Sequence, residues 1–141
     1  MGSALDHADH TADAPITLLI ADDDPVARTM LSISLARRFE LAGVVEDAEQ
    51  AVAAATHARP DVAIVDVQMP GGGGLAAVRG IVQASPHTAV VMLSSDESDE
   101  SVRALLTEGA ACYVRKGVDA DELTAILMRA IRAQNQPAAG H

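Results

Sequence analysis

Short apolar runs alternate with amphipathic segments along most of this chain. The runs are rich in Val, Ile, Leu and Ala, which is typical of strands buried on both faces. In the segments between them, apolar residues recur at the spacing of a helix with one buried face. The pattern predicts strands at 16–21, 41–46, 61–66, 88–93 and 110–115, and helices at 25–39, 48–58, 74–85, 100–109 and 119–134.

Two of the predicted helices carry recognisable start signals. Asp24 precedes Pro25, which is the pattern of an N-cap residue followed by proline at the first helical position. Asp119 lies three residues before Glu122 and forms a capping box with it. These signals support the predicted starts of the first and the last helix.

Five strand–helix units with nearly continuous apolar strands predict a parallel sheet covered by helices on both faces. Each crossover connection between parallel strands should be right-handed. We therefore expect an α/β protein, a doubly wound (βα)5 flavodoxin-like sandwich with a five-stranded parallel sheet in the order 2-1-3-4-5.

The periodic pattern covers residues 16–133, which is enough for one domain with its own core. Residues 1–15 are polar and acidic and end at Pro15, so we expect a flexible leader there. Residues 134–141 lose the periodicity and contain proline and glycine. They are predicted to be a C-terminal tail or the start of a linker.

The composition limits the possible partners. A formal net charge of −10 repels nucleic acids and anionic membranes, so we expect no direct binding of this chain to either. No apolar stretch approaches the roughly 20 residues that span a bilayer. The one cysteine, Cys112, lies in an apolar run and is predicted to be a buried core residue. We expect a cytoplasmic protein.

Acidic residues follow two strands that are neighbours in the predicted order. Asp22 and Asp23 come directly after the first strand, and Asp66 ends the third. Ligands of such sheets bind at the carboxyl ends of the strands, where the strand order reverses. Three carboxylates that converge there need a cation, and oxygen ligands without histidine or cysteine suit a hard ion such as Mg²⁺.

Lys116 is the only lysine of the chain, because the other nine basic residues are arginines. It follows the fifth strand, at the same predicted edge of the sheet as the acids. A compact ammonium can bridge a carboxylate and a phosphoryl oxygen without the broad guanidinium fork of arginine. A surface lysine without such a role is the alternative.

Four motifs occur in order along the chain: the acidic pair Asp22-Asp23, "DVQMP" with Asp66, Ser94 at the end of the fourth strand, and "YVRK" with Lys116. This ordered set resembles the receiver domains of two-component response regulators, over residues 16 to about 133. The glycine run after "DVQMP" and the glycine after Lys116 are similar to NarL/FixJ-type receivers.

The resemblance implies a phosphoacceptor domain of a two-component system or phosphorelay. Asp66 would take a phosphoryl group from a sensor histidine kinase or a phosphotransfer protein. Mg²⁺ would be held by Asp22 through water, by Asp23, by Asp66 and by the backbone carbonyl of Gln68. No enzymatic activity is expected beyond self-phosphorylation and self-dephosphorylation.

The resemblance also implies a switch. Lys116 and the Ser94 hydroxyl would bind the phosphoryl oxygens, and the ring of Tyr113 would move inward as Ser94 moves toward the phosphate. The changed surface, formed by the fourth helix, fifth strand and fifth helix, would contact an output domain, a downstream protein or a second copy in a phosphorylation-dependent homodimer. A half-buried Tyr113 without a switching role is the alternative.

Two other functions remain open. A haloacid-dehalogenase-like phosphatase also uses an aspartyl phosphate and Mg²⁺, and Asp22 with Asp24 forms the Asp-x-Asp pattern of that family. Such enzymes usually carry a cap domain, for which 141 residues leave little space. The other possibility is a pseudo-receiver, an interaction module that works without phosphorylation.

Overall fold

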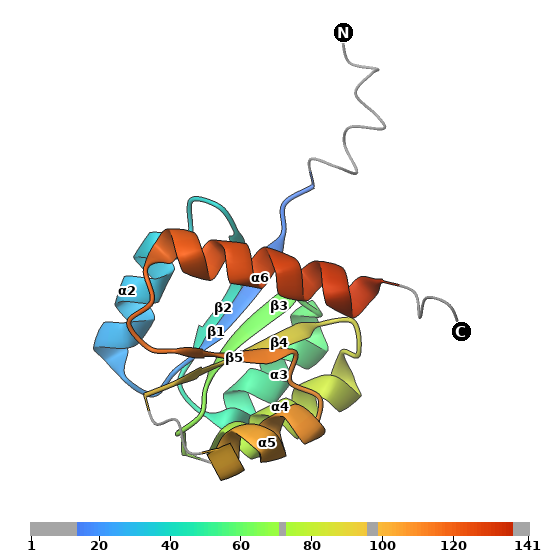
Figure 1. The fold of residues 1–141 in the computed structure, drawn as a ribbon. Helices are drawn as coiled ribbons and strands as arrows, with labels where there is room; N and C mark the ends of the chain where they lie inside the picture. Colours follow the sequence, from blue (N-terminus) through green and yellow to red (C-terminus); the bar gives the residue numbers. More distant parts are fainter. Residues whose placement is uncertain (1–13, 71–72, 96–98, 137–141) are drawn as a thin grey trace, which may run out of the picture.

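The structure, a computed structural model, describes residues 14–70, 73–95 and 99–136. Within these residues, five parallel strands form one sheet in the order β2-β1-β3-β4-β5, as predicted (Figure 1). The strands are β1 (Thr17–Ala21), β2 (Glu40–Val45), β3 (Val62–Asp66), β4 (Ala89–Ser94) and β5 (Cys112–Arg115). The helices are α2 (Pro25–Leu35), α3 (Ala48–Ala58), α4 (Gly73–Ala84), α5 (Asp99–Thr107) and α6 (Ala120–Asn135).

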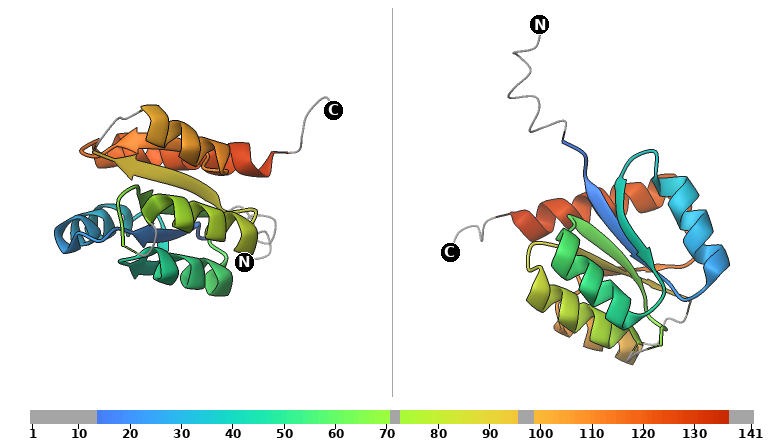
Figure 2. Two further views of the ribbon diagram at one scale, coloured as in Figure 1. Left: turned by 90° about the horizontal axis from the view of Figure 1, so that it is seen from below. Right: turned by 180° about the vertical axis from the view of Figure 1, so that it is seen from behind.

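The helices form a layer on each face of the sheet (Figure 2). Successive strand residues point to opposite faces, so Leu19 and Ala21 join one core while Leu18 and Ile20 join the other. Helices α3, α4 and α5 cover the first core, and α2 and α6 cover the second. Both cores consist almost entirely of aliphatic side chains and Met, because the chain offers only two aromatic residues.

The register between β1 and β3 is fixed at the amino edge of the sheet by a reciprocal pair of hydrogen bonds. The backbone N–H of Thr17 donates to Asp61 Oδ2 over 2.9 Å, and the backbone N–H of Asp61 donates to Thr17 Oγ1 over 3.0 Å. From there the two strands pair without a shift, ending with Ala21 opposite Val65. The residues that follow therefore emerge side by side at the carboxyl edge.

Both predicted helix starts are confirmed. Asp24 caps α2 by accepting a hydrogen bond from the N–H of Val26, and Asp119 caps α6 by accepting from the N–H of Glu122. The first helix ends earlier than predicted, at Leu35 instead of residue 39. The chain turns there because Phe39 enters the core with only 4% of its surface exposed, and β2 begins at the next residue.

The remaining elements agree with the sequence pattern to within two residues. Helix α6 continues to Asn135, two residues past the predicted end of the domain. Most of the predicted leader, residues 1–13, and the last part of the predicted tail, residues 137–141, lie outside the described residues.

Cys112 is half-buried and packs against the core under α2 and α6. Among the described helices, none combines the length and apolarity that crossing a bilayer requires.

Candidate functional site

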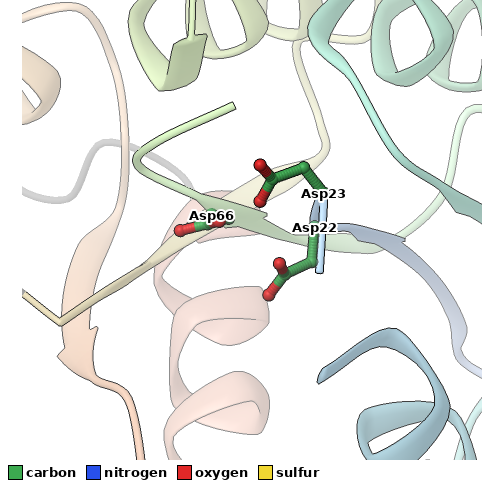
Figure 3. A group of neighbouring side chains, drawn as sticks. All are labelled: Asp22, Asp23 and Asp66. Atoms are coloured by element: carbon green, nitrogen blue, oxygen red, sulfur yellow. The ribbon is translucent and has the colours of Figure 1, made fainter. Parts of the chain in front are cut away.

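Three carboxylates converge at the carboxyl edge of the sheet (Figure 3). Asp22 and Asp23 follow β1, and Asp66 is the last residue of the neighbouring β3. One oxygen from each carboxylate lies within 4.8 Å of the others. Asp22 and Asp66 are buried, with 1% and 4% of their surface exposed, whereas Asp23 is exposed to solvent. The predicted acidic cluster is therefore assembled by the fold.

Asp22 is held firmly but keeps one oxygen available. Its backbone N–H donates to Val45 O over 3.0 Å, and its Oδ1 accepts from the N–H of Asp24 over 3.0 Å. Its Oδ2 is buried and accepts no hydrogen bond from the described residues. A buried carboxylate oxygen without a donor, next to two more carboxylates, fits the all-oxygen coordination of a hard divalent cation. These three residues could hold a metal ion.

Lys116 supplies the positive charge of the site. Its Nζ lies 3.3 Å from Asp66 Oδ1 and 3.6 Å from Asp22 Oδ2. Partial burial opposes the charged form of this side chain, but the two carboxylates outweigh it and raise the pKa of Lys116 above its usual value. The ammonium is thus part of the acidic cluster, and the phosphoryl-binding role of Lys116 stays a prediction.

The pKa of Asp66 is higher than that of an ordinary aspartic acid. Burial, followed by the negative charge of Asp22, raises the pKa of Asp66 to about 6. The Lys116 ammonium and the N–H of Gln68, which donates to Asp66 Oδ1 over 3.3 Å, oppose this rise. Coordination of a metal by the carbonyl of Gln68 stays a prediction. Asp66 therefore binds a proton more readily than an ordinary aspartate, because the single charge of Lys116 does not offset burial and the charge of Asp22.

Ser94 and Tyr113 lie on the strands beyond β3. Ser94 ends β4 with 3% of its surface exposed, and its backbone carbonyl accepts a hydrogen bond from the N–H of Lys116 over 3.0 Å. This bond connects the end of β4 to the lysine. Tyr113 lies on the edge strand β5 with 38% of its surface exposed. The movement of these two residues stays a prediction.

Two features near the site were missing from the sequence prediction. The guanidinium of Arg28 donates to the backbone carbonyl of Asp22 over 2.9 Å. Beside it, a cavity of about 290 Å³ between α2 and α6 reaches Asp22 and Lys116 and is otherwise lined mainly by apolar side chains such as Met30 and Leu123. Neither feature follows from hydrophobic periodicity, because both depend on how side chains of different helices meet.

Asp24, the second acid of the Asp-x-Asp pattern, does not belong to the cluster. Its carboxylate caps α2, where Oδ1 accepts from the N–H of Val26 over 3.0 Å. The haloacid-dehalogenase-like alternative needs both acids of the pattern at the reacting centre. The geometry therefore gives that alternative no support.

Comparisons with known proteins agree with one another. The family model for the response regulator receiver domain matches residues 18–128. Response regulator GacA of Pseudomonas aeruginosa is 31% identical over 121 residues, which cover 84% of this chain and 56% of that protein. The probable transcriptional regulatory protein TcrX of Mycobacterium tuberculosis is 33% identical over 120 residues, which cover 84% of this chain and 50% of TcrX.

The solved structures give the same result for the fold. The receiver domain of the response regulator NarL from Mycobacterium tuberculosis superimposes with a TM-score of 0.75 at 26% identity, covering 82% of this chain and 96% of that one. A CheY-like receiver domain from Methanospirillum hungatei gives a TM-score of 0.80 at 20% identity, covering 86% and 97%. This chain spans about half the length of the curated relatives that it matches.

Proposed function

The chain belongs to the response regulator receiver domains of two-component systems, and from this premise we propose that Asp66 is its phosphoacceptor. Asp66 would take a phosphoryl group from a sensor histidine kinase or a phosphotransfer protein in a Mg²⁺-dependent reaction. The observation that carries the proposal is the position of Asp66: it is buried at the end of β3, 3.3 Å from Lys116 and adjacent to two further carboxylates.

In this reaction the Asp66 carboxylate attacks the phosphorus of a phosphohistidine, the P–N bond breaks, and the imidazole leaves with the electron pair. The product is an acyl phosphate on Asp66. Lys116, already oriented toward Asp66, would bind an oxygen of the transferred group and offset the charge that spreads over its oxygens. Mg²⁺, held by Asp23, Asp66 and the Gln68 carbonyl and through water by Asp22, would supply further positive charge at those oxygens.

The new phosphoryl group would add roughly −1.5 to −2 charges beside Lys116. Ser94 is buried at the end of the adjacent strand, so its hydroxyl would need only a short movement to bind a phosphoryl oxygen. Tyr113, on the neighbouring strand β5, would then move inward. The surface of α5, β5 and α6 would change and contact an output domain, a downstream protein or a second copy.

Helix α2 offers a docking surface for the phosphodonor. Val26, Met30 and Ile33 recur at helical spacing and expose 68%, 60% and 67% of their surface. Exposed apolar residues that gather in one stripe are typical of interaction surfaces. This apolar stripe begins three residues after Asp23, and Met30 lines the cavity that reaches Asp22 and Lys116. A helical histidine phosphodonor seated on the stripe would therefore lie next to the site.

A direct test of the proposed function is intact-mass analysis after incubation with Mg²⁺ and acetyl phosphate. We expect one phosphoryl adduct on the wild-type chain and none on Asp66→Asn. The matched control is Asp24→Asn, which makes the same change two residues after Asp22 and keeps an N-cap, because Asn caps as well as Asp. This control should form the adduct normally.

The phosphatase alternative predicts a different pattern. In that case the purified chain would hydrolyse a phosphomonoester, and Asp24→Asn would abolish the hydrolysis while Asp66→Asn would not. The pseudo-receiver alternative would be supported if neither acetyl phosphate nor a cognate kinase gave an adduct. That last result would overturn the proposed function.

A further inference from the structure

Asp22 lies where the paired part of the sheet ends. β1 pairs with β2 as far as Ala21 and Val45, and with β3 as far as Ala21 and Val65. The backbone carbonyl of Asp22 therefore has no strand partner in these ladders. Since Asp22 is 1% exposed, a backbone group there needs another donor.

The donor is the side chain of Arg28. Its Nη1 lies 2.9 Å from Asp22 O, and the side chain is 22% exposed. Arg28 lies at the beginning of α2, and its side chain reaches back toward the start of the helix, as helical side chains do. The same nitrogen lies 4.0 Å from Glu46 Oε1, just after β2. Arg28 thus connects the loop after β1 to the end of β2.

The helix itself gives no reason for a cation at this position. The start of a helix carries a partial positive charge, which disfavours arginine there, and α2 has no acidic residue in its first turn. The favourable partner is the carbonyl of Asp22. With that bond, the N–H, the carbonyl and Oδ1 of Asp22 are all engaged, and only Oδ2 is left toward Lys116 and the acidic cluster.

We propose that Arg28 is a positioning residue of the cation site. Its bond to the Asp22 carbonyl holds the peptide between Asp22 and Asp23, so that both carboxylates face Asp66 before a cation arrives. This inference rests on the proposed function, in which these carboxylates hold Mg²⁺. It adds a residue that acts on the site through the backbone of a ligand.

The role of Arg28 can be separated from a simple effect of its charge. A guanidinium bonded to the backbone carbonyl of Asp22 repels a cation that approaches the acidic cluster, so its removal would tighten Mg²⁺ binding if charge alone mattered. A positioning role predicts the opposite, because the freed peptide would have to be ordered when the metal binds. The sign of the change in Mg²⁺ affinity therefore distinguishes the two.

The experiment is calorimetric titration of the full chain with MgCl₂. In Arg28→Met, which keeps an unbranched apolar stem but removes the guanidinium and its donors, the dissociation constant should rise about tenfold, the usual cost of losing a partner that orients a ligand. Arg28→Lys keeps a donor and the charge and should recover part of the affinity. Arg37→Met, which removes an exposed cation beyond the end of the same helix, should leave the affinity unchanged.

A second measurement does not involve the metal. In Mg²⁺-free buffer, the N–H of Asp24, which donates to Asp22 Oδ1, should exchange its proton faster in Arg28→Met than in the wild type. The amides of β4 should be unaffected, which would exclude general destabilisation.

The outcomes separate this inference from the proposed function. An adduct on the wild type together with unchanged or tighter Mg²⁺ binding in folded Arg28→Met would overturn the inference alone. A wild-type chain that binds no Mg²⁺ would overturn both. If Arg28→Met does not fold, Arg28→Lys must still bind Mg²⁺ more weakly than the wild type, and equal affinities would overturn the inference.

Discussion

The ammonium of Lys116 lies 3.3 Å from Asp66 Oδ1, yet the pKa of Asp66 is raised rather than lowered. The largest cause is the burial of Asp66, and the second is the negative charge of the neighbouring Asp22, which is also buried. Burial and the charge of Asp22 outweigh the attraction of Lys116. Without a metal, the negative charge of the site is therefore not neutralised. We expect this to affect the stability of the chain and its affinity for Mg²⁺, both in a pH-dependent way.

Asp66→Asn should stabilise the metal-free protein most at neutral pH. The pKa of Asp66 is about 6 in the folded chain and near 3.8 when unperturbed. Between these values the folded chain binds more protons than the unfolded chain, so the free energy of unfolding decreases as pH rises. Each pKa unit corresponds to about 1.4 kcal/mol, and the substitution also removes the charge that pairs with Lys116. We therefore expect the free energy of unfolding of Asp66→Asn to exceed that of the wild type by about 1–2 kcal/mol at pH 7.5.

Urea denaturation with EDTA checks this prediction. The difference between Asp66→Asn and the wild type should be about half as large at pH 5 as at pH 7.5, because the wild-type carboxyl is then largely protonated. An equal difference at both pH values would mean that the buried charge of Asp66 is not the cause.

Mg²⁺ binding should weaken as the pH falls through 6. The metal needs the Asp66 carboxylate, so protons compete with it and binding releases a proton. For one group with a pKa of about 6, the dissociation constant should rise about tenfold between pH 7.5 and pH 5. Calorimetry in two buffers of different ionisation enthalpy measures both the affinity and the released proton. Asp66→Asn should bind more weakly and lose most of this pH dependence.

Ile33→Glu should impair phosphotransfer from a kinase without affecting phosphorylation by acetyl phosphate. Ile33 belongs to the exposed apolar stripe of α2, so a charge there should cost a docking partner roughly 1–2 kcal/mol, or about tenfold in transfer rate at low concentration. The matched control is Ala53→Glu, which adds the same charge at an exposed site on α3, on the other face of the sheet. Equal effects of both variants would contradict a docking role for the stripe.

Tyr113 should become less accessible when Asp66 is phosphorylated. It is the only tyrosine in a chain without tryptophan, so intrinsic fluorescence reports this ring alone. Quenching by acrylamide should decrease on addition of acetyl phosphate and Mg²⁺, because the ring is 38% exposed at the start. Ser94→Ala should remove the change while the adduct still forms. Unchanged quenching in the fully phosphorylated wild type would leave Tyr113 without a switching role.

The order of strands and the meeting of the three carboxylates were accessible from the sequence. Nearly uninterrupted apolar strands require cover on both faces, and in the resulting order β1 and β3 are neighbours whose ends carry acids. The caps at Asp24 and Asp119 were also accessible, because a cap depends on only a few adjacent residues. Local chemistry and sheet topology thus determined most of the site.

The features that were missed depend on contacts between elements. Periodicity predicted a helix from residue 25, but it does not tell which apolar residues a neighbour covers, so the exposure of Val26, Met30 and Ile33 appeared only in the structure. The hydrogen bond from Arg28 to the carbonyl of Asp22 forms only if Arg28 adopts one particular rotamer and if the strand pairing of β1 ends at Ala21. The first helix ends early because burying the ring of Phe39 in the core stabilises the fold more than one further helical turn would.

The reciprocal bonds between Thr17 and Asp61 have a consequence at the far end of the sheet. Asp22 is five residues after Thr17, and Asp66 is five residues after Asp61. Because side chains alternate along a strand, one residue inserted or deleted in either interval would turn an acid to the wrong face. The number of residues between these points therefore determines whether the acidic cluster can assemble, and changes in chain length are better accommodated in the connections between strands and helices.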